Sequence, residues 1–148
     1  MSLNKIGQVL SCSPSTITIS ITDLKTFEEH KKELQIGRLL KISQGNNDFT
    51  IATIRNVKGI DTQHGEGSTY WQFQVECQAI GTIDLDGVFD RGSLLLPVPT
   101  EPVYIADHDT IEKLFAADNE HDFPLGQLSL NKDITLKING NRFFSKHI

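Results

Sequence analysis

One long segment, Thr69–Ile83, alternates large apolar and polar side chains more regularly than any other part of the chain. Trp71, Phe73, Val75 and Cys77 share one parity, and the positions between them are glutamine or glutamate. A period of two places successive side chains on opposite faces of a β-strand. The segment therefore predicts a long half-buried strand that buries these four side chains in a core.

Shorter runs of the same kind recur along the chain and are separated by turn residues. Thr16–Ile21 places three isoleucines on one face and three hydroxyl side chains on the other. The expected strands are Ile6–Leu10, Thr16–Ile21, Ile36–Ser43, Phe49–Val57, Thr69–Ile83, Pro102–Ala106, Leu125–Leu130 and Ile134–Ile138. Many short strands favour a mainly β chain whose sheet closes into a small antiparallel β-barrel, because closure removes exposed edges.

Three segments stand apart from the strand pattern. Asp109–Ala117 has apolar residues at i, i+3 and i+4 behind an acidic first turn, which predicts one short helix. Leu24–Leu34 is charged and leaves two interpretations open, a helical turn or a connection. Asp61–Ser68 is polar and contains two glycines, a composition typical of a mobile surface loop. The expected architecture is thus a closed barrel with one short helix.

Size, charge and cysteine usage limit the classes of function. The 148 residues suit one domain, and the net charge of -5 counts against a broad surface for phosphate backbones. No apolar run approaches the ~18 residues of a bilayer span, and the N-terminus lacks a signal-type apolar region. We therefore expect a soluble, cytoplasmic protein without membrane contact. Cys12 and Cys77 lack the spacing of a disulfide framework or zinc site, so we expect reduced thiols.

Motifs for nucleotide and metal chemistry are missing from the sequence. It has no phosphate-binding glycine loop, and within the clearly helical pattern of Asp109–Ala117 no histidine falls at i, i+3 or i, i+4 from another histidine, a cysteine or a carboxylate. We assign it no catalytic, cofactor-binding or metal-ligating residue. Asp107-His108-Asp109 favours a helix N-cap, with an oriented general base of a small enzyme as the other interpretation. Asp84-x-Asp86-Gly87 favours a tight turn, because the later ligands of a calcium loop are missing.

Two features bear on nucleic acid. Trp71 and Phe73 are residues of the kind that a single-strand-binding barrel uses as stacking platforms, but the alternation places both in the core. Basic residues near the C-terminus fit a solvated face or a surface that faces nucleic acid; they are Lys132, Lys137, Arg142, Lys146 and His147. A free-standing OB-like barrel that binds single-stranded nucleic acid is therefore the alternative function.

Several short stretches carry a resemblance to a known family through their order. They are Ile6–Ser11 with Ser13-Pro14, Ile36–Ile42, Phe89-x-Arg91-Gly92 leading to Pro97, Pro102–Ala106 followed by Asp109–Phe115, Leu125–Leu128 and Asn139–Ile148. In this order the chain is similar to the N-terminal HAS-barrel of HerA-type hexameric ATPases of the FtsK/HerA superfamily, which are DNA translocases. That barrel shares its shape with the N-terminal crown of rotary ATP synthase subunits.

The resemblance implies a β-barrel domain at residues 1–138 that performs no chemistry itself. Residues 139–148 would then begin the connection to an ATPase domain that this chain lacks. In the family the barrel forms a ring of identical subunits in the hexamer and presents a platform for a nuclease or other effector. ATP and Mg would belong to the ATPase domain, and double-stranded DNA to the full-length assembly.

Phe89 and Arg91 are the candidate residues for subunit or partner contact, because Arg91 is the one arginine in a predominantly apolar stretch. A plain core-and-rim role is the alternative interpretation. Gly7, Gly37 and Gly92 fit tight bends of a small barrel, where a side chain would crowd the neighbouring strand.

Overall fold

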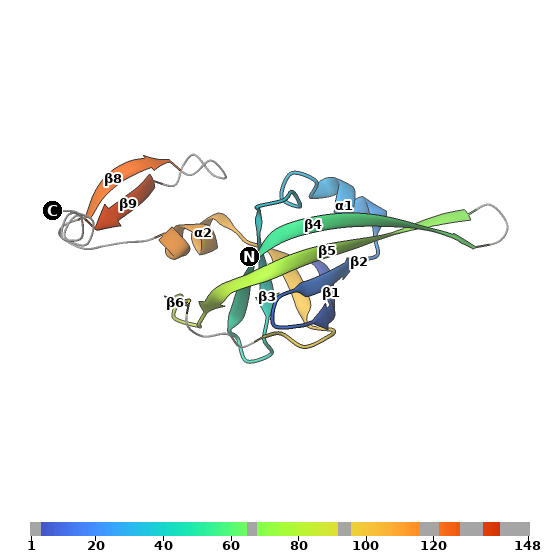
Figure 1. Cartoon of the computed structure of the whole chain (residues 1–148), viewed down its shortest axis with the longest axis horizontal. Coiled ribbons are helices and arrows are strands. Elements are labelled where there is room, and N and C mark those ends of the chain that lie inside the picture. Colours follow the sequence, from blue (N-terminus) through green and yellow to red (C-terminus); the bar gives the residue numbers. More distant parts are fainter. Residues whose placement is uncertain (1–3, 65–67, 92–95, 116–121, 128–134, 140–148) are drawn as a thin grey trace. The chain divides into compact units, whose positions relative to one another are not determined.

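The computed structural model of the chain (Figure 1) describes residues 4–64, 68–91, 96–115, 122–127 and 135–139. These residues fall in two compact units, Met1–Ala106 and Asp107–Ile148. The first unit contains strands β1 to β7 and one helix, and the second contains the other helix and two strands. Each unit is described by itself.

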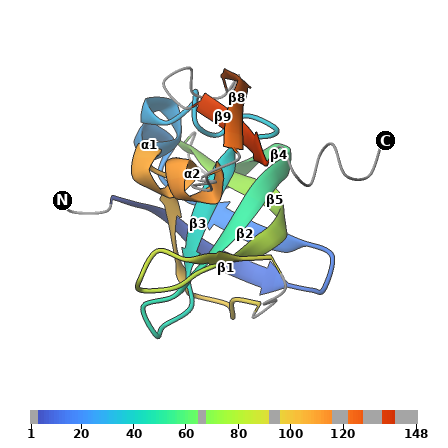
Figure 2. The same ribbon diagram turned by 90° about the vertical axis from the view of Figure 1, so that its left-hand side faces the viewer.

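The first unit is a closed antiparallel β-barrel. Its strands are β1 (Lys5–Cys12), β2 (Ile17–Ile21), β3 (Leu39–Ser43), β4 (Phe49–His64), β5 (Ser68–Ile83), β6 (Phe89–Asp90) and β7 (Pro102–Ile105). They pair in the order β2-β1-β7-β3-β4-β5-β6, and a further pairing of β2 with β5 closes a ring of six strands that leaves β6 as an extra strand. The strands follow one another around the barrel in Figure 2. The expected closed β-barrel is confirmed.

The barrel interior is filled by the apolar face of each strand. Ile17, Ile19 and Ile21 of β2 are all buried, as the alternation in that segment predicts. The core cluster of buried side chains also includes Ile6, Val9, Leu34, Leu40, Ile42, Ala52, Ile54, Phe73, Val75, Cys77 and Val103. Small barrels have interiors just wide enough for side chains to fill, which matches this packed core.

The consecutive strands β1 and β2, and likewise β3 and β4, form antiparallel hairpins. At the β1–β2 turn, the backbone N–H of Ser13 donates to the Thr16 carbonyl at 2.8 Å. The β3–β4 turn places Gly45 and Asn47 at positive φ, a conformation that glycine and asparagine adopt more readily than other residues. β4 shifts register twice against β5, between Ile51 and Ala52 and between Ile54 and Asn56, as a bulged strand does.

The three glycines expected at tight bends have different roles. A Cβ at Gly7 would lie 2.5 Å from the Ser20 carbonyl oxygen, so β1 and β2 can approach this closely only at a glycine. The expectation of crowding is wrong for Gly37, where an added Cβ would meet nothing within 4 Å. Its φ of +87° instead requires the left-handed conformation. Gly92 lies outside the described residues.

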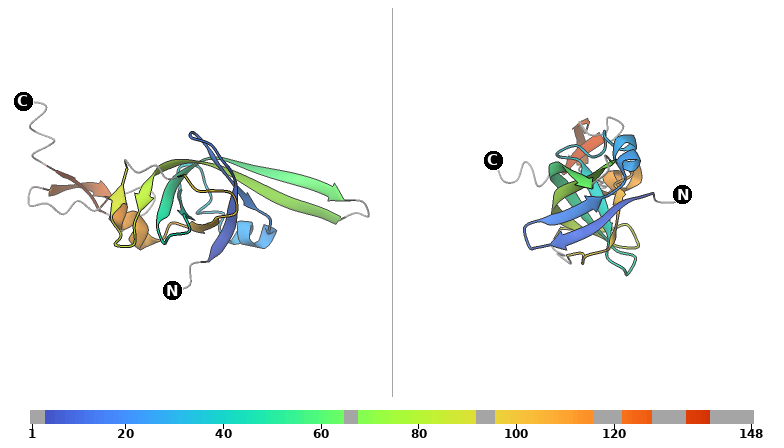
Figure 3. Two further views of the ribbon diagram at one scale, coloured as in Figure 1. Left: turned by 90° about the horizontal axis from the view of Figure 1, so that it is seen from below. Right: turned by 90° about the vertical axis from the view of Figure 1, so that its right-hand side faces the viewer.

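β4 and β5 continue past the barrel as a two-stranded ribbon, which we call the arm: Lys58–His64 of β4 and Ser68–Gln72 of β5. β3 pairs with β4 only as far as Thr53, and β2 pairs with β5 only as far as Phe73. The arm extends beyond β2 in Figure 3. The expectation of a loop over Asp61–Ser68 is therefore wrong for Asp61–His64 and Ser68, because strand pairing continues to His64 opposite Ser68. Residues 65–67 lie outside the described part.

Helix α1 (Leu24–Glu29) packs one aromatic ring against the base of the arm. The Asp23 carboxylate caps this helix by accepting from the Thr26 backbone N–H at 3.1 Å. The Phe27 ring stacks on Phe73 with centroids 3.7 Å apart, and Trp71 stacks near Phe73 at 6.1 Å. Of the two interpretations of Leu24–Leu34, the helical turn is thus correct for its first part, which gives the described chain a second short helix.

Trp71 corrects one expectation about the core. Phe73, Val75 and Cys77 are buried as predicted, but Trp71 is 42% exposed. It shares their parity, yet it lies beyond the last residue of β5 that pairs with β2. The alternation continues along β5 past the point at which the barrel ends.

The second unit contains helix α2 (His108–Phe115) and strands β8 (Asp122–Gln127) and β9 (Thr135–Asn139), which pair antiparallel. All six strands of the barrel ring lie in the first unit, before residue 107. The expected domain limits of 1–138 and 139–148 stay a prediction, and residues 140–148 lie outside the described part. Within the described residues, no helix combines the length and the apolar character needed to cross a membrane.

Candidate interaction site

The two residues singled out for partner contact lie together at the extra strand of the barrel. β6 pairs Phe89 with Ile83 and Asp90 with Thr82 of β5. The Phe89 ring lies against Gly81, where an added Cβ would be 2.5 Å from the ring atom Cε2. The Arg91 guanidinium carbon lies 6.0 Å from the centroid of the Phe89 ring, within range of a cation–π contact. Arg91 is exposed and Phe89 is half-buried.

The turn before β6 adds two exposed apolar side chains. The Gly87 N–H donates to the Asp84 carbonyl at 3.0 Å, and the Val88 N–H donates to Asp84 Oδ1 at 2.9 Å. These bonds form a tight turn, so that interpretation of Asp84-x-Asp86-Gly87 is confirmed. The turn leaves Leu85 72% exposed and Val88 60% exposed. Large apolar side chains grouped on a surface are typical of contact sites.

Acidic residues lie next to the exposed side chains of the turn and of β6. Asp48, Asp84 and Asp90 line a pocket of about 420 Å³ together with Thr82, Val88 and Phe89. We call Leu85, Val88, Phe89 and Arg91, with the bordering Asp84 and Asp90, the β6 patch. Within the described residues, no three potential ligand side chains come together as a metal site. The patch combines apolar contact area with carboxylates, which suits a protein surface that offers apolar and basic groups.

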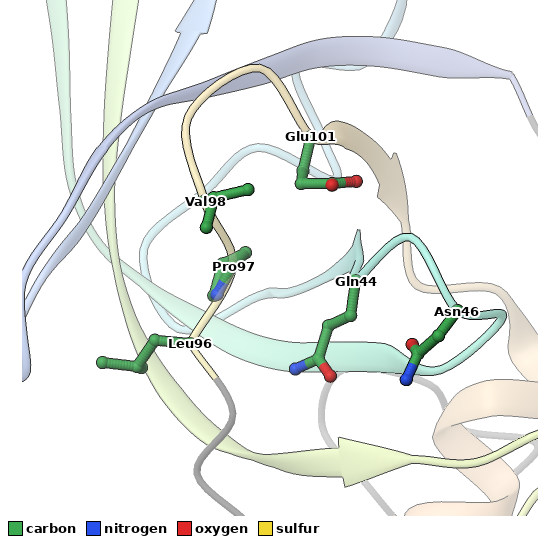
Figure 4. Close-up of a pocket in the computed structure, with 6 residues that line it drawn as sticks. All are labelled: Gln44, Asn46, Leu96, Pro97, Val98 and Glu101. Carbon is green, nitrogen blue, oxygen red and sulfur yellow. The ribbon is translucent and has the colours of Figure 1, made fainter.

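A second pocket, of about 270 Å³, lies between the β3–β4 turn and the segment that leads into β7 (Figure 4). Its polar wall consists of the Gln44 and Asn46 amides and the Glu101 carboxylate, and its apolar wall consists of Leu96, Pro97 and Val98. The two amides and the carboxylate can hold a polar ligand by hydrogen bonds and by charge. None of the described lining residues is a histidine, cysteine, serine or threonine that would act as a nucleophile.

The acid–base cluster before α2 caps the helix. Asp107 Oδ1 accepts from the Thr110 backbone N–H at 2.8 Å, so the N-cap interpretation is confirmed for Asp107. His108 Nε2 lies 3.9 Å from the Glu112 carboxylate one turn further along the helix. Both of these side chains are largely exposed.

The two cysteines are free thiols in different surroundings. Burial among the core side chains, aided by the negative charge of Glu76, raises the pKa of Cys77 to about 12. Partial burial also raises the pKa of Cys12 above its usual value. A raised pKa lowers the thiolate fraction near neutral pH, which makes both residues poor nucleophiles.

Aromatic residues on the arm bear on the nucleic-acid alternative. Tyr70 is 60% exposed and Trp71 is 42% exposed, so one of the two predicted platforms is accessible while Phe73 stays buried. Among the arm residues whose side chains the structure describes, the exposed charged ones are Lys58 and Asp61, which have opposite signs. Of these basic residues near the C-terminus, Lys137 belongs to β9, and Lys132, Arg142, Lys146 and His147 lie outside the described residues.

Comparisons with protein-family models and with curated proteins find no match to this chain.

Sequence reasoning missed several residues of these surfaces. The sequence Asp-Leu-Asp-Gly did contain a signal for the exposure of Leu85, because an apolar residue inside a tight turn has few neighbours to bury it. The pocket between Gln44, Asn46 and Glu101 had no such signal. Gln44 and Asn46 lie 50 or more positions before the other four lining residues along the chain, and the pairing of β3 with β7 brings the two segments together.

Proposed function

We propose that this chain is a non-catalytic β-barrel that serves assembly and partner docking, as the N-terminal domain of a HerA-like DNA translocase. The observation that carries this proposal is a closed six-stranded barrel in which β1, β7 and β3 are neighbours. Three of the stretches on which the resemblance rests coincide with these strands, so they form one continuous part of the barrel wall. A packed apolar interior supports a structural role for the barrel.

In this proposal the β6 patch is the contact surface. Phe89 is held in place by pairing with β5 and by packing over Gly81, and a rigid apolar side chain is a good anchor. Arg91 lies beside it, and the bordering aspartates favour a partner with basic groups. The partners are identical subunits of a hexamer, and a nuclease or effector protein. ATP, Mg and double-stranded DNA bind other parts of a cytoplasmic full-length assembly.

The test measures self-association of the chain by native mass spectrometry and sedimentation velocity over a range of concentrations. We expect oligomers up to the hexamer that weaken when Arg91 is replaced in Arg91→Glu. Lys113→Glu, a charge reversal at an exposed position of α2, is the matched control and should leave these oligomers unchanged. Oligomers equally sensitive to both variants, or a chain without species above the dimer, would contradict the assembly role.

Exposure of Tyr70 and Trp71 favours one other function, binding of single-stranded nucleic acid along the arm. Trp71 is the only tryptophan, so its fluorescence reports stacking of a base on this ring. A titration with single-stranded DNA at low salt decides between the functions. Saturable quenching of Trp71 fluorescence would favour the alternative if a folded Trp71→Ala variant also loses DNA binding. Anisotropy of labelled DNA measures binding by this variant, which has no tryptophan.

A further inference from the structure

The pocket between the β3–β4 turn and the segment before β7 lies at one end of the barrel (Figure 4). Gln44 directly follows β3 and has the parity of Leu40 and Ile42, which are completely buried in the core. Its amide Nε2 donates to the hydroxyl of Thr50, which pairs with Ile42 across the sheet. The pocket therefore opens where the apolar interior of the barrel ends, and the mouths of β-barrels are preferred places for ligand sites.

Backbone hydrogen bonds hold the Glu101 side of the pocket in place. The Val9 N–H donates to the Glu101 carbonyl at 2.9 Å, and the Thr100 N–H donates to the Val9 carbonyl at 2.8 Å. Between these bonds Thr100 has a φ of +79°, in the left-handed region that a β-branched residue rarely adopts. Strained backbone persists only where its surroundings hold it, and it clusters at ligand sites. Strand β1 thus fixes the point from which the Glu101 side chain extends.

The β3–β4 turn makes room for the Glu101 carboxylate. Gly45 has no side chain, and a Cβ added there would lie 3.4 Å from Glu101 Oε1. In the same turn, Asn46 Nδ2 donates to Asp48 Oδ2 at 3.2 Å, and Asn46 Oδ1 accepts from the Asp48 N–H at 3.3 Å. These two bonds hold the Asn46 amide in the pocket wall.

The lining combines one negative charge with an apolar wall. Glu101 is half-buried, and it is the only charged side chain among the described lining residues. Partial removal from water strengthens the attraction between a carboxylate and a cation. Leu96, Pro97 and Val98 form the wall across from the polar side chains in Figure 4. This pocket repels an anion, and a hydrated metal ion gains nothing from its apolar wall. The matching ligand is a cation that carries an aliphatic chain.

We propose that this pocket binds a guanidinium group on a short aliphatic chain. A planar guanidinium donates two parallel N–H bonds to one carboxylate, here that of Glu101, and Asn46 Oδ1 has a second lone pair for a third bond. The aliphatic chain lies against Leu96 and Val98, as arginine stems do on apolar surface. The pocket volume of about 270 Å³ suits a group of this size. A free alkylguanidine and the arginine side chain of a partner protein present this same chemistry.

The guanidinium site is separate from the β6 patch. The two pockets share none of their described lining residues. Guanidinium binding at Glu101 therefore stands or falls independently of the assembly role. The aspartates of the β6 patch also attract cations, so the experiment has to show which of the two surfaces the ligand occupies.

The first experiment titrates n-propylguanidinium chloride into the isotope-labelled full chain and follows the backbone amide signals by NMR. We expect saturable shifts at Gly45, Asn46 and Glu101 with a dissociation constant of about 1 mM, the weak affinity of a small ligand held mainly by one carboxylate. n-Propylurea has nearly the same shape without the charge and should bind about tenfold more weakly. Equal binding of the urea, or larger shifts at Asp84 and Asp90 than in the pocket, would overturn the proposal.

The second experiment repeats the titration on variants whose fold is checked by circular dichroism. Glu101→Gln removes the charge and keeps the shape and the backbone bonds, and it should raise the dissociation constant by about tenfold. Glu33→Gln is the matched control, the same replacement at an exposed residue outside the pocket lining, and should change the constant by less than about twofold. Val98→Lys, at a 60% exposed position of the lining, adds a competing ammonium group and should also weaken binding. Equal effects of the two glutamine variants, or unchanged binding by folded Val98→Lys, would contradict the proposal.

A capped Ala-Arg-Ala peptide distinguishes the two sources of the guanidinium group. Shifts of the same amides at similar concentrations would identify an arginine side chain of a partner protein as a fitting occupant. Binding of n-propylguanidinium without binding of the peptide would identify a free small molecule instead. Failure of both probes to shift the pocket amides would rule out the site.

Discussion

Strands β4 and β5 belong to both the barrel and the arm, yet they bury their side chains to different degrees in the two regions. Within the barrel, β5 lies between β4 and β2, and Val75 and Cys77 are almost fully buried. A few residues away on the arm, the same face of β5 leaves Trp71 42% exposed. A strand's alternation shows which face is apolar, and sheet closure decides how far along the strand that face is covered.

The largest expected difference between the two regions is in core truncation. Ile19→Ala removes a fully buried side chain from the barrel and should lower the free energy of unfolding by about 2–5 kcal/mol. Trp71→Ala, on the arm, should cost about 1 kcal/mol despite the larger side chain, since its ring is partly in water and loses one stacking contact. Urea denaturation followed by circular dichroism measures both. Equal losses would show that the arm is as much part of the core as the barrel.

Glycine replacements sharpen the comparison at the level of the backbone. Gly7→Ala places a Cβ 2.5 Å from a backbone oxygen of β2, which has to move, so we expect a loss of about 1–3 kcal/mol. Gly59→Ala on the arm meets the half-exposed Trp71 ring at 3.3 Å and the Phe73 ring at 3.6 Å, which are side-chain atoms and not backbone. Its cost should stay below about 1 kcal/mol. Thermal unfolding of the two variants compares them, and a larger cost at Gly59 would contradict the view of the arm as the less constrained region.

Alkaline pH should weaken the barrel through Cys77. Its pKa is about 12 in the folded chain and close to 9.0 when exposed, so the unfolded state releases the proton first. The stabilisation is complete below pH 9.0 and is lost as pH rises towards 12. The fall in unfolding free energy between neutral pH and about pH 10 should be smaller in Cys77→Ala than in the wild type. Equal falls in the two proteins would contradict a buried, protonated thiol.

The smallest effect is expected at Asp23, where α1 begins beside the base of the arm. The hydrogen bonds from Thr26 lower the pKa of the Asp23 carboxyl. A lowered pKa stabilises the fold above the unfolded-state value, and this contribution disappears as pH falls through the folded-state value. Asp23→Ala should therefore lower the melting temperature slightly near neutral pH and leave it unchanged in strong acid. Asp86→Ala is the control, and a constant deficit across the pH range would argue against the charged cap.

The sequence was informative where structure depends on near neighbours. The isoleucines of β2 and the turn at Asp84 follow from local patterns, and both were predicted. The exposure of Trp71 was not predicted, because it depends on where β2 ends. The last residue of β2, Ile21, pairs with Phe73 and lies some 50 positions before Trp71 in the sequence. The extension of β4 to His64 was missed for a different reason, because pairing with Ser68–Trp71 of β5 holds this polar segment extended although its composition is typical of a loop.

The candidate site also contains both kinds of feature, those that the local sequence predicts and those that depend on strand pairing. Phe89 and Arg91 were chosen from their order in an apolar stretch, and the structure places them together beside β5. Gly81 was not singled out, although its missing side chain makes room for the Phe89 ring. That role depends on the register between β5 and β6, which the spacing of residues in the sequence does not specify.

The pairing of β1 with β7 determines how the barrel responds to mechanical load. Lys5 pairs with Tyr104, so the chain enters and leaves the barrel at adjacent points on neighbouring antiparallel strands. A pull on these two points acts across the strands and breaks their hydrogen bonds one after another, as in opening a zipper. A moving assembly that drew on the chain at both points would open the barrel at low force, whereas a load on one point alone would leave this seam closed.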